Sequence, residues 1–185
     1  TASIQVSLDY TSEKDAVQKL RLATGLAPIL SAIFSNSPIS EGKLNGFYSK
    51  RYYIWAHTSP ERTGIIEGVF REDFTFDDYV DYALSVPMIF IIRKNQWVAI
   101  KNLSFGTFLE KGALGYFATQ EDWQLHLSTI FTDVRLKQYL EIRSVDCQKR
   151  TLGLSVPALL KGLFYDALSQ KKAWDLVAPL SLNER

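Results

Sequence analysis

Apolar and polar residues alternate in two short stretches of the chain, and each stretch is predicted to be a strand. Residues 3–8 place an apolar side chain at every second position, which is the period-2 pattern of a half-buried strand. Residues 139–143 show the same alternation, with Glu141 and Arg143 on one face and apolar residues on the other. A continuous apolar run over 88–92, followed by a turn and a return segment, predicts a hairpin that begins with a buried strand.

Apolar residues spaced three or four apart predict helices, and several of these start at a capping side chain. The first helix follows Ser12, and Pro28 should kink or divide it. The predicted helices cover residues 13–34, 44–57, 76–84, 105–110, a segment opened by Thr119, and 159–174. Strands and helices that do not alternate regularly indicate an α+β fold around a mostly antiparallel sheet. No internal repeat or linker divides the sequence, so we expect a single domain over residues 1–185.

Net charge, hydrophobicity and cysteine content exclude several classes of protein. The 185 residues carry a formal net charge of +1 and are 46% hydrophobic, so the chain lacks the basic excess of a protein that binds nucleic-acid phosphates. No apolar run approaches the length needed to cross a membrane. Cys147 is the only cysteine, so no internal disulfide can form, which fits a reducing compartment. We therefore expect a cytoplasmic protein with no nucleic-acid or membrane partner.

Common nucleotide and nucleophile motifs are absent from the sequence. It has neither type of glycine-rich phosphate loop, no nucleophile elbow, and too few histidines and cysteines for a zinc site of usual spacing. Cys147 is interpreted as an incidental thiol, and His126 as a satisfied buried imidazole. A bound nucleotide would therefore need a carboxylate-held metal ion, and arginines on a sheet, to hold its phosphates.

Two groups of residues could carry such chemistry. Glu141 and Arg143 suit a site that binds a divalent cation through the carboxylate and a phosphate through the guanidinium; the alternative is a solvated ion pair. Between residues 35 and 64, polar side chains interrupt an aromatic run, which suits binding of a carboxylate by arginine in a dry pocket. The alternative there is a helix with aromatic residues in the core and arginines in solvent. The polar members are Asn36, Ser37, Arg51, His57 and Arg62.

Several segments together carry a likeness to a known family. They are residues 3–10 (Ser-Ile-Gln-Val-Ser-Leu-Asp-Tyr), 36–38 (Asn-Ser-Pro), 46–47 with Arg51 and Trp55, 62–64 (Arg-Thr-Gly), 79–84 (Tyr-Val-Asp-Tyr-Ala-Leu), 87–88 (Pro-Met) and 139–143 (Tyr-Leu-Glu-Ile-Arg). In this order and spacing they resemble the glutamate–cysteine ligase family of the plant and proteobacterial type. The resemblance covers nearly the whole chain and is more specific than any single motif.

The resemblance implies a fold and a reaction. The fold is glutamine-synthetase-like, with a mostly antiparallel curved sheet that forms a half-funnel and with helices outside it. The reaction is the first step of glutathione biosynthesis, which joins the γ-carboxyl group of glutamate to the amino group of cysteine. It uses ATP as co-substrate and Mg²⁺ as cofactor, and it passes through γ-glutamyl phosphate.

The resemblance also implies roles for individual residues. Glu141 corresponds to a Mg²⁺ ligand, Arg143 to the group that meets the charge of the transferring phosphoryl group, and Arg51 to the clamp on the α-carboxylate of glutamate. The other substrate-binding candidates are Gln5 and Ser7 as contacts that line the funnel, Trp55, His57 and Phe131 as walls of the cysteine pocket, and Arg62 and Arg135 as phosphate or carboxylate contacts.

The sequence also departs from the family pattern. The family carries a Glu-x-Glu-like strand before the position that matches Thr1 and continues beyond the one that matches Arg185, so we expect a fold incomplete at both ends and a fragment that is catalytically incomplete. Ala2 and Leu22 stand where one pair of regulatory cysteines would be, which argues against regulation by that disulfide. Two alternatives stay open: a γ-glutamyl ligase for another amine, and a non-catalytic module that binds glutamate or assembles with other chains. An exposed sheet edge would favour self-association.

Overall fold

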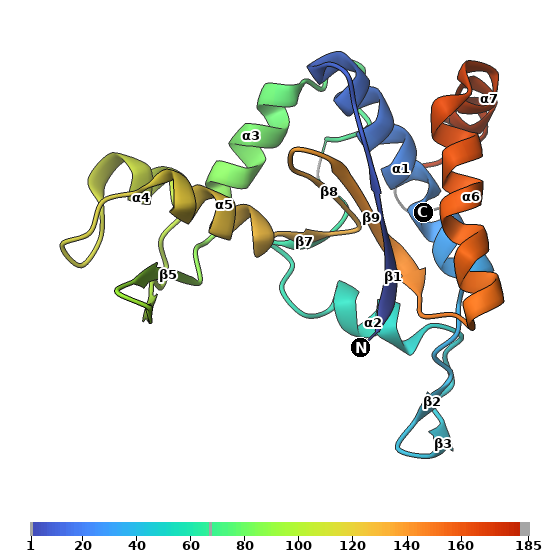
Figure 1. Ribbon diagram of the computed structural model, residues 1–185, viewed down its shortest axis with the longest axis horizontal. Coiled ribbons are helices and arrows are strands. Elements are labelled where there is room, and N and C mark those ends of the chain that lie inside the picture. Colours follow the sequence, from blue (N-terminus) through green and yellow to red (C-terminus); the bar gives the residue numbers. More distant parts are fainter. Residues whose placement is uncertain (1, 67, 182–185) are drawn as a thin grey trace.

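A three-stranded antiparallel sheet lies at the centre of the computed structural model, which describes residues 2–66 and 68–181. Its strands are β1 (Ser3–Leu8), β9 (Leu140–Asp146) and β8 (Val134–Leu136), in the order β1-β9-β8. Figure 1 shows β9 between its two neighbours. Both strands predicted from alternation are therefore confirmed, and they pair with each other.

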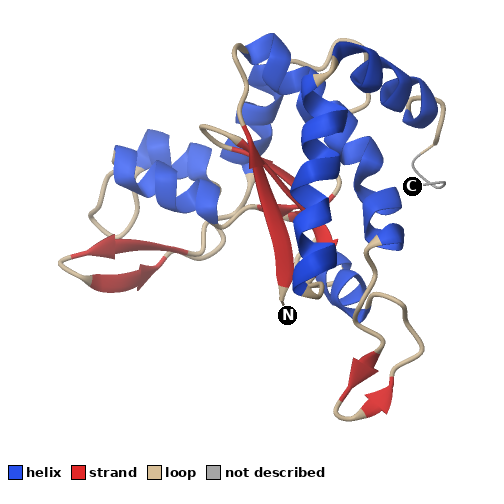
Figure 2. Cartoon of the chain, turned by 45° about the vertical axis from the view of Figure 1, so that its right-hand side comes forward, coloured by secondary structure: helices blue, strands red, loops and turns tan. Residues whose placement is uncertain are grey.

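Long helices cover the apolar face of this sheet. They are α1 (Glu13–Ile33) and α6 (Arg150–Tyr165), and α7 (Ala167–Val177) packs against both of them; all three lie on one side of the sheet in Figure 2. Leu140 and Ile142 of β9 share one hydrophobic core with Leu20 of α1 and Leu160 of α6. Burial of this apolar surface is the main stabilising contribution to the fold.

The long helices follow the predictions in part. Pro28 lies inside α1 and does not divide it, so a kink remains the predicted effect of this proline. The single helix predicted over 159–174 is wrong, because α6 ends at Tyr165 and α7 starts at Ala167. Asp166 separates them, and its carboxylate accepts a hydrogen bond from the backbone N–H of Ser169 at 2.7 Å, which caps α7.

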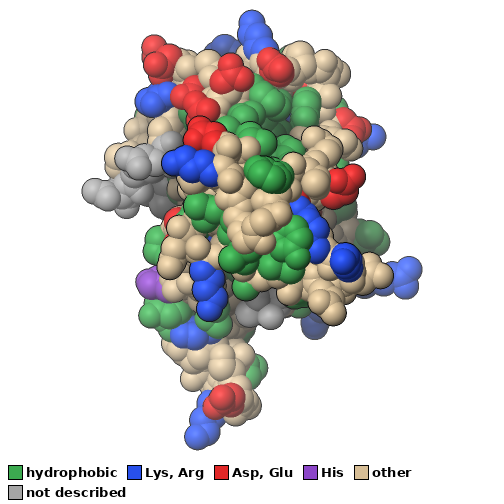
Figure 3. All heavy atoms as spheres, turned by 90° about the vertical axis from the view of Figure 1, so that its left-hand side faces the viewer, with side chains coloured by type: hydrophobic (Ala, Val, Ile, Leu, Met, Phe, Trp, Pro, Cys, Tyr) green, Lys and Arg blue, Asp and Glu red, His purple; other side chains and the backbone are tan. Residues whose placement is uncertain are grey.

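A second group of elements extends away from the sheet and has its own small core of Met88, Ile91, Ile100, Phe105 and Phe108. The predicted hairpin is confirmed, but its first strand is not buried throughout, because Ile89 and Ile92 are both 42% exposed. Figure 3 views the molecule from the side on which this second group lies and shows apolar side chains on its surface. The elements are α3 (Phe76–Ser85), β5 (Phe90–Arg93), β6 (Gln96–Ala99), α4 (Phe105–Lys111) and α5 (Gln120–Ser128).

Short elements connect these two parts. The helix predicted over 44–57 is confirmed only in its second half, as α2 (Lys50–Ala56). Gly46 has a φ of +78°, which a helix cannot contain, and the helix begins only where the Ser49 hydroxyl caps it. The remaining strands are β2 (Ile39–Ser40), β3 (Lys43–Leu44), β4 (Thr63–Gly64) and β7 (Phe131–Thr132), of which β4 and β7 pair in parallel.

The α+β class and the mostly antiparallel pairing agree with the sequence analysis, but the described residues form several small sheets rather than one extended curved sheet. Within residues 2–66 and 68–181, no helix combines the length and the apolar character that a membrane crossing requires.

A β-bulge decides which side chains of β9 share a face. Val6 pairs with Ile142 and Ile4 pairs with Val145, so β9 carries one more residue than β1 between these pairs. The extra residue shifts the alternation by one position. Val145 therefore joins Leu140 and Ile142 in the core, and Asp146 shares the opposite face with Glu141.

Candidate functional site

The face of β9 opposite the helices carries charged side chains that are almost completely buried. Glu141 is 8% exposed, Arg143 6% and Asp146 2%. The alternative of an ion pair in solvent is therefore wrong for Glu141 and Arg143. We call the set of Arg51, Asp133, Arg135, Glu141, Arg143 and Asp146 the acid–arginine cluster.

Glu141 lies between two arginines. Its Oε2 accepts hydrogen bonds from Nε of Arg135 at 2.9 Å and from Nη1 of Arg143 at 2.8 Å, and Nη2 of Arg135 lies 2.6 Å away. No hydrogen bond from the described residues reaches Oε1. Burial by itself raises the pKa of Glu141, but the hydrogen bond from Arg143 and the charges of both arginines outweigh it, so the pKa lies below its usual value.

Arg143 is enclosed by aromatic rings. Its guanidinium carbon lies 5.4 Å from the ring centroid of Trp55 and 5.8 Å from that of Phe131, within the range of a cation–π interaction. Trp55 is fixed in turn, because its Nε1 donates to the backbone carbonyl of Phe131 at 2.8 Å. Nη1 of Arg143 also donates to Gln5 Oε1 at 3.3 Å. Burial lowers the pKa of Arg143, although the bond to Glu141 opposes this.

Arg51 reaches the same strand from α2. Its Nη2 donates to the backbone carbonyl of Arg143 at 2.5 Å, and its Nη1 lies 3.5 Å from Asp146 Oδ1. The residue is 5% exposed. Arg51, carried by α2, therefore contacts the segment of β9 that contains Arg143 and Asp146.

Asp133 belongs to the cluster but was not singled out from the sequence. It is 1% exposed, and the hydroxyl of Tyr52 donates to its Oδ2 at 3.1 Å. Burial raises the pKa of Asp133, and the bond from Tyr52 together with the charges of Arg51 and Arg143 offsets only part of this. Asp133 lies between β7 and β8, where no alternation pattern signalled a strand or a face.

Two arginines of the cluster carry buried polar atoms without a hydrogen-bond partner. In the part of the chain that the structure describes, the buried side-chain atoms with no hydrogen bond are Nη1 of Arg51, Nε of Arg143 and Oγ of Ser144. The Arg51 atom has Asp146 at 3.5 Å, but without hydrogen-bond geometry. Buried polar groups are nearly always paired, so each exception needs an explanation. The atoms of Arg51 and Arg143 belong to the acid–arginine cluster, and Ser144 follows Arg143 along β9.

The remaining candidates are placed differently. Ser7 pairs with Glu141 in register but is exposed, as is Gln5. Arg62 lies outside the cluster and donates to the backbone carbonyls of Thr129 and Pro87. His57 is exposed, and its ring stacks on Tyr53 with centroids 4.4 Å apart.

His126 is a satisfied buried imidazole, as predicted. It is 3% exposed, and its Nε2 lies 2.8 Å from the backbone carbonyl of Ala83.

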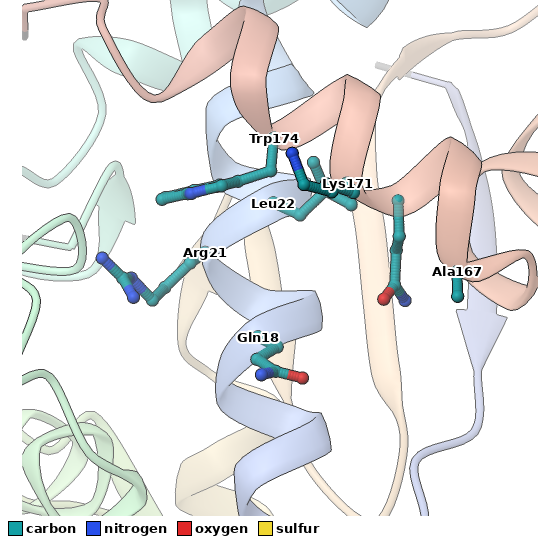
Figure 4. A pocket seen from close by; sticks show the side chains of 7 residues that line it. Gln18, Arg21, Leu22, Ala167, Lys171 and Trp174 are labelled. Atoms are coloured by element: carbon teal, nitrogen blue, oxygen red, sulfur yellow. The ribbon is translucent and has the colours of Figure 1, made fainter.

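A cavity of about 260 Å³ lies elsewhere, between α1 and α7. Figure 4 shows Trp174 extending from α7 towards Arg21 on α1, and the guanidinium carbon of Arg21 lies 4.8 Å from a ring centroid of Trp174. Arg21 also donates to the backbone carbonyls of Val69 and Phe70. Through these contacts Arg21 has a structural role, because it connects α1 with α7 and with the loop after β4. Neither Glu141 nor Arg143 lines this cavity.

Comparison with known proteins gives a consistent result. A family model described as glutamate-cysteine ligase family 2 (GCS2) matches residues 1–185. Among similar curated proteins are the chloroplastic glutamate–cysteine ligases of Medicago truncatula, 42% identical, of Solanum lycopersicum, 43% identical, and of Arabidopsis thaliana, 44% identical. Each match covers 100% of this chain but only 37%, 36% and 36% of the relative, respectively. The chain thus spans rather more than a third of the length of these relatives.

The names of these relatives correct one expectation. The sequence alone predicts a cytoplasmic location, whereas each of these relatives is named as a chloroplastic protein. The prediction from a single cysteine is therefore contradicted, since a low cysteine content does not distinguish the cytoplasm from other reducing compartments.

Proposed function

Because this chain belongs to glutamate–cysteine ligase family 2, we propose that the protein carrying it joins the γ-carboxyl group of glutamate to the amino group of cysteine. ATP and Mg²⁺ take part, and the product enters glutathione biosynthesis. The γ-carboxylate attacks the terminal phosphorus of ATP, γ-glutamyl phosphate forms and ADP leaves. The cysteine amine then attacks the acyl carbon and releases phosphate.

The observation that carries this proposal is the set of unpartnered donors in the acid–arginine cluster. Nη1 of Arg51 and Nε of Arg143 are buried N–H groups without a hydrogen bond. An anionic oxygen is the partner that a guanidinium binds most strongly. A carboxylate or phosphate entering beside β9 would satisfy both donors, and the substrates of the proposed reaction carry both groups.

Distinct roles follow for the arginines. Arg51 binds the α-carboxylate of glutamate, and Arg143 stabilises the charge on the transferring phosphoryl group. Trp55 and Phe131, which flank Arg143, exclude water and so strengthen its interactions with anions. Arg135 holds Glu141 in place through two of its nitrogens.

Glu141 fits Mg²⁺ as one ligand of a larger set. Its Oε1 accepts no hydrogen bond from residues 2–66 or 68–181, while Oε2 is held by two arginines. Mg²⁺ is normally bound by one or two carboxylates together with nucleotide phosphates. Within those same ranges, no group of three or more His, Cys, Asp or Glu side chains could hold a metal ion. When bound, the ion would neutralise charge on the phosphates beside Arg143.

The fold and the location are part of the proposal. The β1-β9-β8 sheet, with helices on one face and the charged cluster on the other, supports a glutamine-synthetase-like catalytic fold. In the described part β1 has one neighbouring strand, so its free edge is available for pairing with a further strand or another chain. The relatives' names support a plastid location.

The test is release of ADP by the full-length protein in the presence of glutamate and a panel of amines. We expect release that requires Mg²⁺ and that cysteine stimulates more than any other amine. Equal or greater stimulation by another amine would instead indicate a different γ-glutamyl ligase. Glutamate binding in calorimetry without any Mg²⁺-dependent ATP binding would indicate a non-catalytic module.

A further inference from the structure

The carboxylate of Asp146, the last residue of β9, contacts four residues from outside the sheet. Its Oδ2 accepts hydrogen bonds from the backbone N–H of Asn36 at 2.9 Å and from the Ser37 hydroxyl at 2.8 Å. Its Oδ1 accepts from the Ser49 hydroxyl at 3.0 Å and lies 3.5 Å from Nη1 of Arg51. A single carboxylate therefore joins the end of β9 to the loop after α1 and to the start of α2.

The hydroxyls of Ser37 and Ser49, which donate to Asp146, also accept hydrogen bonds from the backbone of α2. Ser37 Oγ accepts from the backbone N–H of Arg51 at 3.0 Å, and Ser49 Oγ accepts from the backbone N–H of Tyr52 at 3.1 Å. Each hydroxyl must donate its own proton to Asp146 so that its lone pairs face these N–H groups. The first turn of α2, which carries Arg51, is thereby held against β9 through the carboxylate.

The side chain of Arg51 is fixed against the same strand. Its Nη2 donates to the backbone carbonyl of Arg143, three residues before Asp146. The bulge in β9 is what makes this arrangement possible, because it turns Asp146 to the face that carries Arg143. The position of Arg51 relative to Arg143 is thus set by β9 at two points.

We propose that Asp146 is a positioning residue of the site, which acts by fixing Arg51 at the distance from Arg143 that glutamate requires. This inference rests on the proposed function, in which Arg51 binds the α-carboxylate. Asp146 does not touch the substrate. It determines the position of Arg51 and does not take part in the chemistry of phosphoryl transfer.

Both oxygens of Asp146 are needed for this role. Asn36 N–H on one side and the Arg51 guanidinium on the other can only donate. In Asp146→Asn, the amide NH₂ must face one of these two donors, whichever way the group is turned. The variant therefore keeps the shape of the side chain but loses either the hydrogen bond from Asn36 or the charge attraction to Arg51, whose Nη1 lies 3.5 Å from Oδ1 without a hydrogen bond.

The experiment compares the Michaelis constants of Asp146→Asn and a matched control in the full-length protein. Asp122 is the control, because it is also buried and accepts from an arginine (Arg93), a hydroxyl and a backbone N–H (both of Thr119), but in the second group of elements. We expect Asp146→Asn to raise KM for glutamate about 10- to 100-fold, as for the loss of a charged hydrogen bond, with KM for ATP nearly unchanged. Asp122→Asn should lower thermal stability to a similar degree and leave KM for glutamate unchanged.

Two outcomes overturn the inference. One is a wild-type KM for glutamate in Asp146→Asn, and the other is an equal rise in both variants, which would mean that general destabilisation is responsible. If Asp146→Asn fails to fold, Ser37→Ala removes one bridging hydroxyl and should raise KM for glutamate in the same direction by a smaller factor. A wild-type KM in that variant would likewise contradict the role.

A second readout separates this inference from the proposed function. If the wild-type protein releases no ADP, the ligase assignment fails, but amide hydrogen exchange still reports on the attachment. Exchange at Arg51 and Tyr52 should be about tenfold faster in Asp146→Asn than in the wild type, corresponding to about 1.4 kcal/mol of lost protection. Exchange in α5 should not change. Unchanged exchange at the start of α2 would overturn the positioning role.

Discussion

Leu140 and Ile142 on one face of β9 are 0% and 1% exposed, and Glu141 and Arg143 on the other face are 8% and 6% exposed. The two faces are thus buried to a similar extent, but they contribute to the molecule in opposite ways. Burial of the apolar pair stabilises the fold, whereas burial of charges carries a desolvation cost that a salt bridge often only balances. The comparison fits our proposal, in which the face towards the helices holds the strand in place and the charged face binds the substrate.

The largest effect should come from the charged face. Arg143→Met removes the guanidinium between Trp55 and Phe131, and we expect kcat of the full-length protein to fall about 100- to 1,000-fold, as when one group that stabilises a transition state is removed. The measurement is ADP release at saturating substrates. A kcat within a factor of two or three of the wild-type value would show that Arg143 does not act on the phosphoryl group.

The neighbouring residue on the apolar face should give the reverse result. Ile142→Ala leaves a cavity against α1, and we expect the free energy of unfolding in urea to fall by about 3 kcal/mol. The kcat and KM of the protein that remains folded should stay at wild-type values. If Ile142→Ala lowered kcat as strongly as Arg143→Met, the two faces would not be functionally distinct.

A smaller effect should separate charge from shape on the charged face. Glu141→Gln keeps the shape but loses the charge between Arg135 and Arg143, and we expect the free energy of unfolding at pH 7 to fall by about 2 kcal/mol. The pKa of Glu141 is lowered in the folded state, so its stabilising contribution is complete above the unfolded pKa of about 4.3 and is lost as the pH falls through the folded pKa.

The pH dependence checks this explanation. Urea unfolding of the wild type and of Glu141→Gln should show a constant difference at pH 7 and pH 6 that shrinks below about pH 4.3. A difference that did not change with pH would mean that the carboxylate charge is not what stabilises the wild type.

Part of this arrangement could be predicted from the sequence. Alternation identified β1 and β9 and placed Glu141 and Arg143 on one face, because side-chain direction along a strand follows a period of two. The same rule could not place Asp146, since a bulge of one residue reverses the alternation and no residue pattern marked it. Alternation also predicts one solvated face, whereas both faces of β9 are buried.

The partners of the cluster were harder to predict for a different reason. Arg135 meets Glu141 across neighbouring strands, and Asp133 meets Tyr52 from a separate helix, so both contacts depend on tertiary structure. The family resemblance nominated Arg135 but not Asp133. His57 and Arg62 belonged to the same aromatic and polar run as Arg51, but only Arg51 lies on the part of α2 that faces β9.

The most direct test of the account is calorimetric titration of glutamate into the full-length protein and into Arg51→Met, with Arg93→Met as the control. Arg93 also pairs with a buried carboxylate, Asp122, but it lies in the second group of elements. We predict that Arg51→Met weakens glutamate binding about 10- to 100-fold and that Arg93→Met binds as tightly as the wild type. Wild-type affinity in Arg51→Met, or equal weakening in both variants, would contradict the claim that the charged face of β9 binds the substrate.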